Sequence, residues 1–224
     1  NSFEYITDEM RKHKCALRYD VENINKIIKK ANRNGFLVTL NHPRWSLNNY
    51  EDYSKIKGLW GVEVYNHLCQ ITGYEENDTP LIDLLRLGNN VVPIASDDTH
   101  FVESAFGGFT MIEAHSLKYE EILSAMENGD LYSSSGPLIN EMYIENNVLT
   151  INCSEVSQII LNTERRYSDS VKGEKITTAS FDISDYLTKT AFANDDEPRF
   201  IRIIIKDNNG KKAWTRAYFY NEIK

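Results

Sequence analysis

The residues of this chain with the clearest chemical potential are two histidines and a carboxylate that follow apolar runs. His42 comes two residues after the run 36–40, and Asp98 and His100 come shortly after the run 91–95. In an extended backbone, side chains two residues apart point the same way, so Asp98 and His100 could reach one ion. Two imidazoles and a carboxylate favour Zn, Mn or Fe over Ca or Mg. We therefore expect His42, Asp98 and His100 to be metal ligands of one site.

A cation held in this way would polarise a phosphoryl oxygen and activate water for attack, so Asp98 is expected to be essential for catalysis. Ligating imidazoles usually donate their second N–H group to a fixed acceptor. Five further polar residues near the strand ends are expected to support the ligands or to contact substrate: Asn41, Arg44, Glu63, Asn66 and Asp97. Arg44 is the expected contact for an anionic group.

The elements that must position these residues are short strands. The runs 36–40, 60–65 and 91–95 are nearly continuous and rich in Val, Ile and Leu, which is typical of parallel strands buried on both faces. Helical spacing of apolar residues predicts helices over residues 21–34 and 79–87, between the strands. Because sites in parallel α/β folds lie at the carboxyl ends of strands, the three polar clusters should meet at one rim.

The strand and helix alternation, which includes a fourth strand over residues 109–114, changes after the serines at 133–135. These serines lack the strand-to-helix frame of a nucleophilic serine and are expected to form a linker. Apolar residues then alternate with period two, and residues 207–210 (DNNG) predict a hairpin. We predict a partial α/β barrel domain over residues 1–137 and a small antiparallel β-sandwich domain over residues 138–224.

Bulk composition argues against several classes of protein. A net charge of −8 and a pI near 5.2 give no general attraction for nucleic acid or anionic membranes. No apolar run approaches the length of a membrane span, and no signal peptide is recognisable. The three cysteines show no CxxC spacing, which fits a reducing compartment. We therefore expect a cytoplasmic protein that acts neither on membranes nor on nucleic acid.

Several segments resemble the later motifs of the PHP family, the polymerase and histidinol phosphatase metal-dependent phosphoesterases. These segments are Asn41-His42-Pro43, residues 61–66 (GVEVYN) and residues 96–100 (SDDTH). Residues 107–109 (GGF) and 132–137 (YSSSGP) are similar to the downstream part of PHP-like proteins that carry a C-terminal β domain. The resemblance implies a distorted seven-stranded β/α barrel that holds two or three divalent metal ions, often Zn, Mn or Fe, and hydrolyses phosphoesters.

The resemblance matches His42 to the histidine that ends a middle strand, and Asp98 and His100 to the closing Asp-x-His pair. The family opens with a His-x-His strand end and then supplies another histidine and a bridging glutamate. This chain contains no His-x-His, and its first histidine, His13, lies in a charged stretch. We therefore expect the C-terminal half of a barrel with part of the active site. Self-association or an N-terminal segment would complete it around a small-molecule or nucleotide phosphoester.

Two other functions fit the same residues. Another metal-dependent barrel hydrolase, such as an amidohydrolase-like enzyme acting on C–N bonds, would use the same types of ligand. A non-catalytic binding protein would use the β domain to recognise a partner or a glycan, with the incomplete barrel as its scaffold. Stoichiometric metal together with phosphoester hydrolysis would favour the phosphoesterase, and substrate profiling would separate it from the amidohydrolase-like enzyme.

Overall fold

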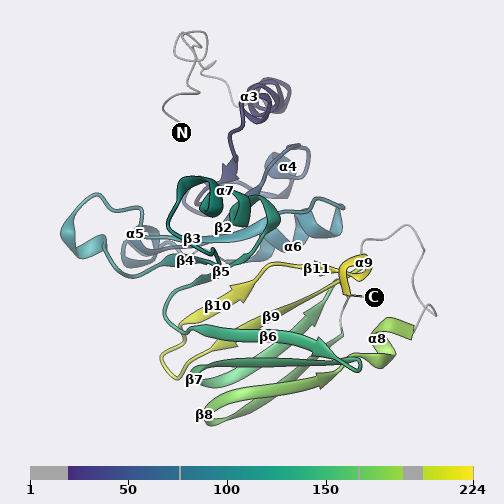
Figure 1. Cartoon of the computed structure of the whole chain (residues 1–224). Helices are drawn as coiled ribbons and strands as arrows, with labels where there is room; N and C mark the ends of the chain where they lie inside the picture. The colour runs from purple at the N-terminus through teal and green to yellow at the C-terminus, as the bar shows by residue number, and fades with distance from the viewer. Residues whose placement is uncertain (1–19, 76, 166, 189–198, 224) are drawn as a thin grey trace.

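The computed structural model describes residues 20–75, 77–165, 167–188 and 199–223. These residues form a mixed α/β fold with a three-stranded parallel sheet and an eight-stranded antiparallel sheet. Figure 1 shows the helices α3, α4 and α7 on one side, the parallel strands in the middle and the large sheet on the other side. No described helix has both the length and the apolar character needed to cross a membrane.

The three apolar runs form the predicted parallel strands. They are β1 (Thr39–Leu40), β2 (Gly61–Asn66) and β3 (Val92–Ser96), in the order β1-β2-β3. Val62 and Val64 of β2 are fully buried, as expected for a central strand covered on both faces. Because all three strands run in the same direction, their carboxyl ends lie at one rim of the sheet.

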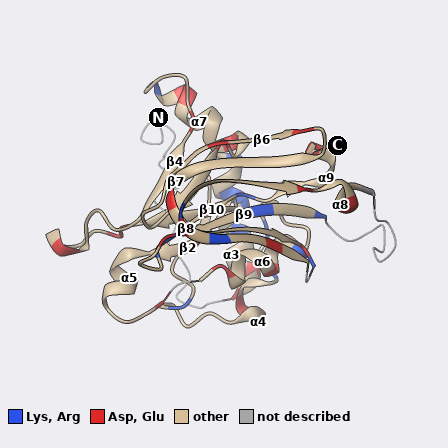
Figure 2. Ribbon diagram, turned by 90° about the horizontal axis from the view of Figure 1, so that it is seen from below, with Lys and Arg blue, Asp and Glu red and all other residues tan. Residues whose placement is uncertain are grey.

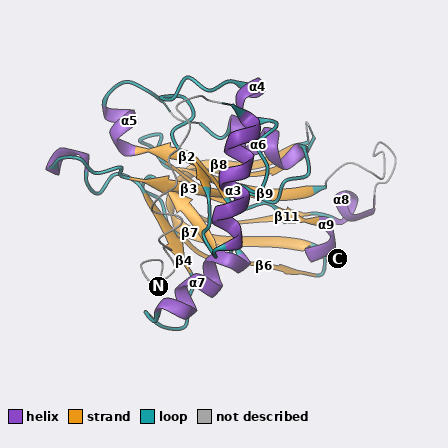
Figure 3. Ribbon diagram, turned by 90° about the horizontal axis from the view of Figure 1, so that it is seen from above, coloured by secondary structure: helices purple, strands orange, loops and turns teal. Residues whose placement is uncertain are grey.

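The helices predicted over residues 21–34 and 79–87 are present as α3 and α6, and sequence signals mark an end of each long helix. Helix α3 (Val21–Arg33) begins after Asp20, whose carboxylate accepts the Glu22 N–H group, and α6 (Thr79–Arg86) has a proline in its first turn. Helix α7 (Tyr119–Asn128) ends at Gly129, which has a left-handed φ of 77°. Figure 3 shows these helices across the strands. The short helical segments are α4 (Tyr50–Tyr53), α5 (His67–Ile71), η1 (Val102–Ser104), α8 (Ser184–Thr188) and α9 (Tyr220–Ile223).

Two expectations for the middle of the chain are wrong. The fourth strand, β4 (Phe109–Ile112), does not extend the parallel sheet but pairs antiparallel with β5 (Leu131–Ser134). The serines at 133–135 are not a linker, because Ser133 and Ser134 lie in β5 and all three are buried. Strand β5 also pairs with β10, so β4 and β5 share a sheet with strands that follow residue 137.

Hydroxyl groups of β4 and β5 cover the edge of β3. The Thr110 hydroxyl donates to the Ala95 carbonyl at 3.0 Å, and its oxygen accepts the Ala95 N–H group at 3.1 Å. The Ser133 hydroxyl donates to the Pro93 carbonyl at 2.7 Å. These bonds satisfy backbone groups that a strand partner would otherwise satisfy. The two sheets therefore meet through side chains at β3.

The large sheet is antiparallel, as predicted, but its strands form one curled sheet instead of two packed sheets. Its order is β4-β5-β10-β9-β7-β6, with β8 paired to β7 and β11 paired to β9. Register shifts between Asn152 and Gln158 bend the long strand β7, which pairs with β8 along most of its length. The remaining bounds are β6 (Ile139–Glu145), β7 (Val148–Thr163), β8 (Ser168–Asp182), β9 (Phe200–Lys206), β10 (Lys212–Thr215) and β11 (Tyr218–Phe219).

Strand β9 lies between two hydrophobic cores. Its odd-numbered residues, Ile201, Ile203 and Ile205, are fully buried in the core enclosed by the curled sheet. Phe200 and Ile204 pack into the other core, with residues of β2 and α6. The alternation of a strand places Arg202 on the same face as Phe200 and Ile204. The predicted hairpin at residues 207–210 joins β9 to β10.

Candidate functional site

A buried glutamate is the centre of the hydrogen-bond network at the carboxyl rim. Glu63 of β2 is 3% exposed. Its Oε2 accepts the backbone N–H group of His42 at 2.6 Å and the side-chain amide of Asn66 at 3.1 Å. Its Oε1 accepts the Ser96 hydroxyl at 2.5 Å. One carboxylate therefore joins the ends of all three parallel strands, and its three donors compensate for its lost hydration.

Asn66 connects this buried carboxylate to Asp98. Its side-chain N–H groups donate to Glu63 Oε2 at 3.1 Å and to Asp98 Oδ2 at 3.2 Å. Its Oδ1 accepts the Cys69 N–H group at 2.9 Å and so caps the short helix α5. All three polar positions of this 1% exposed amide are thus engaged, which fixes its orientation. Asn66 therefore holds the Asp98 side chain in place.

Asp98 and His100 lie together, as predicted. The distance between Asp98 Oδ1 and His100 Nε2 is 3.3 Å, and the two side chains are 35% and 65% exposed. Two ligand atoms that each lie about 2.0 to 2.1 Å from a tetrahedral metal ion are about 3.3 Å apart. A separation of 3.3 Å is that of a direct contact between a carboxylate and an imidazole, and it is also compatible with one edge of a tetrahedral metal site. Asp98 also has a left-handed φ of 51°, a conformation that costs free energy and is often found at functional sites.

His42 meets the same network through its backbone. Its φ is 31°, and its N–H group is the one bound to Glu63. Its imidazole Nδ1 lies 3.0 Å from the Ser46 hydroxyl, and its ring packs edge-on against Trp45 at 5.0 Å between centroids. The Ser46 contact orients the imidazole through one nitrogen and leaves Nε2 as the nitrogen for a ligand.

The structure does not assemble the three predicted ligands into one group. Among the residues that the structure describes, no three His, Cys, Asp or Glu side chains are placed to hold a metal ion together. Asp98 and His100 form a pair, and the His42 imidazole is not part of it. His13, the first histidine, lies outside the described residues. The rim thus contains the Asp98–His100 pair, and a hydrogen bond from Asn66 fixes the Asp98 side chain.

Asp97 binds a neighbouring loop and turns away from the Asp98 network. Its carboxylate accepts the backbone N–H groups of Phe106, Gly107 and Gly108 at 2.6 to 2.7 Å. Burial raises the pKa of the Asp97 carboxyl, but the three backbone donors and the nearby His67 imidazole outweigh this effect and hold the pKa below its ordinary value. Asp97 therefore anchors the loop that follows β3.

Two glycines allow this loop to approach the strands. A Cβ atom on Gly107 would lie 2.1 Å from ring atoms of His67, and one on Gly108 would lie 2.6 Å from the Ser96 carbonyl oxygen. The His67 ring is itself oriented by the Tyr65 hydroxyl, 3.1 Å from its Nδ1. Only glycine fits at such distances.

The remaining predicted residues lie at the margin of the rim. Asn41 is exposed, and its Oδ1 accepts the Thr39 hydroxyl at 2.5 Å, which directs it along its own strand. Arg44 is exposed on the loop that follows β1.

Three serines of the network were not predicted from the sequence. Ser96 donates to Glu63, Ser46 contacts the His42 ring, and Ser104 accepts the His100 backbone N–H group at 3.2 Å. Ser96 could have been found, because it directly ends the third apolar run. Ser46 lies in a loop four residues after His42, and Ser104 lies in η1 four residues after His100, and no periodic pattern marks either serine.

No family model, curated protein or solved structure matches this chain.

Proposed function

We propose that the chain contains the C-terminal part of a PHP-type barrel and belongs to a metal-dependent phosphoesterase. Its substrate would be a small-molecule or nucleotide phosphoester. The observation that supports this proposal best is the Asp98–His100 pair, whose donor atoms are separated by 3.3 Å at the carboxyl rim. The hydrogen bonds from Asn66 to Asp98 and to the buried Glu63 add the fixed supporting shell that such a site requires.

The residues at the rim fit a divalent ion with nitrogen and oxygen ligands. Asp98 Oδ1 and His100 Nε2 would hold it. When bound, such an ion supplies positive charge that polarises the phosphoryl group and activates water. Asn66 would keep the Asp98 carboxylate oriented, and Arg44 would contact a phosphate oxygen of the substrate.

Ligands other than Asp98 and His100 would be needed to complete the metal site. Loops at the rim expose large apolar side chains, with Leu47 at 80%, Val102 at 84% and Phe106 at 97% exposure. Exposed apolar groups beside a partial site favour a covering partner. A second copy of the chain or an N-terminal segment would fill this role and bring additional ligands.

Hydrolysis of an aryl phosphate by the purified chain tests the proposal. With millimolar Mn²⁺ or Zn²⁺ we expect slow turnover that EDTA abolishes, because the ligand set is partial. His100→Gln should lower the rate at least about tenfold, since loss of a metal ligand costs more than loss of its supporting group. His115→Gln is the matched control, because His115 is an exposed loop histidine outside the rim network.

Three outcomes would contradict the proposal. The first is equal rates for His100→Gln and His115→Gln, and the second is the absence of any metal-dependent turnover. The third is hydrolysis of an aryl amide in preference to the aryl phosphate, which would favour the amidohydrolase-like alternative.

A further inference from the structure

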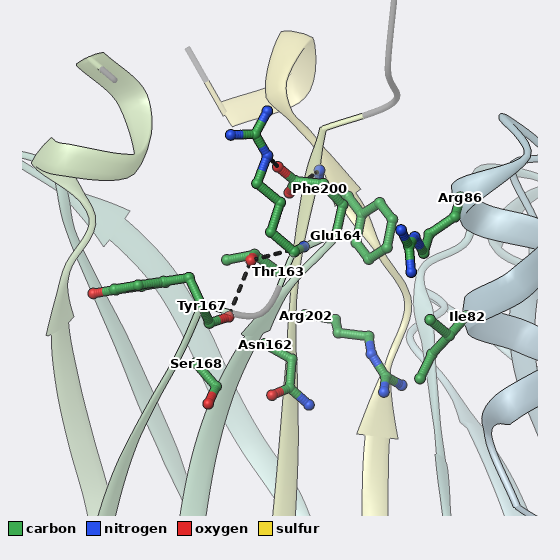
Figure 4. A pocket seen from close by; sticks show the side chains of 10 residues that line it. Ile82, Arg86, Asn162, Thr163, Glu164, Tyr167, Ser168, Phe200 and Arg202 are labelled. Carbon is green, nitrogen blue, oxygen red and sulfur yellow. Dashed lines mark hydrogen bonds and ion pairs between the residues drawn. The ribbon is translucent and has the colours of Figure 1, made fainter. Parts of the chain in front are cut away.

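A second polar site lies between helix α6 and the strands β7 and β9. It is a hollow of about 570 Å³, a size typical of small-molecule sites. Three arginines line it: Arg86 at the end of α6, Arg165 just after β7, and Arg202 on β9. Figure 4 shows the side chains of Arg86 and Arg202 extending into the space between the helix and the strands. None of the residues of the rim network lines this hollow.

Arg202 is a buried cation with an unused donor. It is 2% exposed, and its Nη2 lies 2.5 Å from Asp78 Oδ2. Its Nη1 is buried and has no hydrogen-bond partner among the described residues. A buried donor without an acceptor is destabilising, and a guanidinium group cannot lose its proton to avoid this. An acceptor that enters the hollow would remove the penalty.

Arg165 also has a buried nitrogen without a hydrogen-bond acceptor among the described residues. Its Nη2 is buried and unpartnered within the described part of the chain, although its Nε lies 3.4 Å from Glu164 Oε1. The other oxygen of Glu164 is already engaged, because it accepts the Tyr186 hydroxyl at 3.2 Å and the Phe200 N–H group at 3.3 Å. Neither Glu164 nor Asp78 therefore supplies the missing acceptors.

Charge also favours an anion in the hollow. Three arginines line it, whereas the only carboxylates in contact with them through described ion pairs are Glu164 and Asp78. The local excess of positive charge contrasts with the net charge of −8 for the whole chain. Basic positions along β9 are visible in Figure 2. Guanidinium groups bind carboxylate and phosphate oxygens with paired, charge-assisted hydrogen bonds.

We infer that this hollow binds a small organic molecule through a phosphate or carboxylate group. The oxyanion would accept from the free nitrogens of Arg165 and Arg202 and from Arg86. Phe200 and Ile82 give the hollow apolar surface for the organic part of the molecule. The site is separate from the proposed metal site and does not require it.

Isothermal titration with phenyl phosphate, benzoate and inorganic phosphate tests this inference. The chain is first freed of metal on a chelating resin, so that no metal at the rim can bind the probes, and ionic strength is held constant with chloride. We expect saturable binding of phenyl phosphate or benzoate that is tighter than the binding of inorganic phosphate. Tighter binding of phenyl phosphate identifies a phosphate site, and tighter binding of benzoate identifies a carboxylate site.

Arg86→Gln should weaken this binding by about tenfold or more, the usual effect of losing a charge-assisted hydrogen bond. Arg33→Gln is the matched control, because Arg33 and Arg86 are both exposed arginines in the last turn of a helix. Arg165→Gln is a second variant with the same expected loss. The inference would be overturned if no probe bound saturably, or if Arg33→Gln weakened binding as much as Arg86→Gln.

Discussion

At the scale of single residues, the neighbouring carboxylates Asp97 and Asp98 have different roles. Asp98 faces the Asn66 and His100 side chains at the rim, whereas Asp97 accepts three backbone N–H groups of the loop 106–108. The sequence identified both carboxylates because they follow an apolar run. It could not assign their roles, since these depend on a left-handed backbone at Asp98 and on a loop that returns from ten residues further along the chain.

Gly108→Ala should destabilise the fold by about 1 to 3 kcal/mol, the usual cost of overpacking a tight site. The new methyl group would lie 2.6 Å from the Ser96 carbonyl oxygen, a backbone atom that cannot rotate away. Urea unfolding followed by circular dichroism measures the change.

Gly173→Ala is the matched control for this prediction. Its new methyl group would meet Ile176 at 3.4 Å, an ordinary contact, so the free energy of unfolding should change by less than about 0.5 kcal/mol. Similar stability of Gly108→Ala and the wild-type chain would show that the loop does not need to approach β3 so closely.

At the scale of elements, periodicity predicted the type of each long element but not the partners of the short ones. Helices α3, α6 and α7 have clear apolar spacing and end signals, and strands β1 to β3 have continuous apolar runs, so all were predictable. Strands β4 and β5 each contain four residues, too few to distinguish parallel from antiparallel pairing. The serines at 133–135 seemed typical of a linker, but the Ser133 hydroxyl bonds to the backbone of β3 and the Ser135 hydroxyl bonds to the backbone of β10.

Strand β9 illustrates what alternation can and cannot predict. The alternating Ile201, Ile203 and Ile205 correctly predicted a strand with one apolar face. The burial of Arg202 on its other face could not be predicted, because it depends on contact with the distant Asp78 at the start of α6. A strand between two cores carries polar side chains only where another element supplies a partner.

At the scale of the whole molecule, the two sheets share a hydrophobic core. Strands β9 and β10 contribute Phe200, Ile204 and Trp214 to the core beneath the parallel sheet, where they pack with buried residues such as Val62 and Leu81. The odd-numbered residues of β9 simultaneously line the second core. Because both cores depend on β9, loss of either sheet would expose apolar surface of the other.

We therefore expect the parallel sheet and the large sheet to unfold together. Native-state hydrogen exchange should give the slowest amides of β2 and β9 the same free energy of opening, equal to that of global unfolding. Protection that persists in β9 and β7 after β2 has exchanged would instead indicate two units that unfold independently near the predicted boundary at residue 137.

We propose that Asp98 and His100 form part of a metal site, and paramagnetic NMR of the histidine side chains is a direct test of this proposal. The chain has five histidines, and Mn²⁺ broadens the signals of those close to it. We predict that the His100 imidazole signals broaden at a lower Mn²⁺ concentration than those of His115, and that Asp98→Asn raises the concentration needed at least about tenfold. Parallel broadening of His100 and His115, or a response unchanged by Asp98→Asn, would contradict the account.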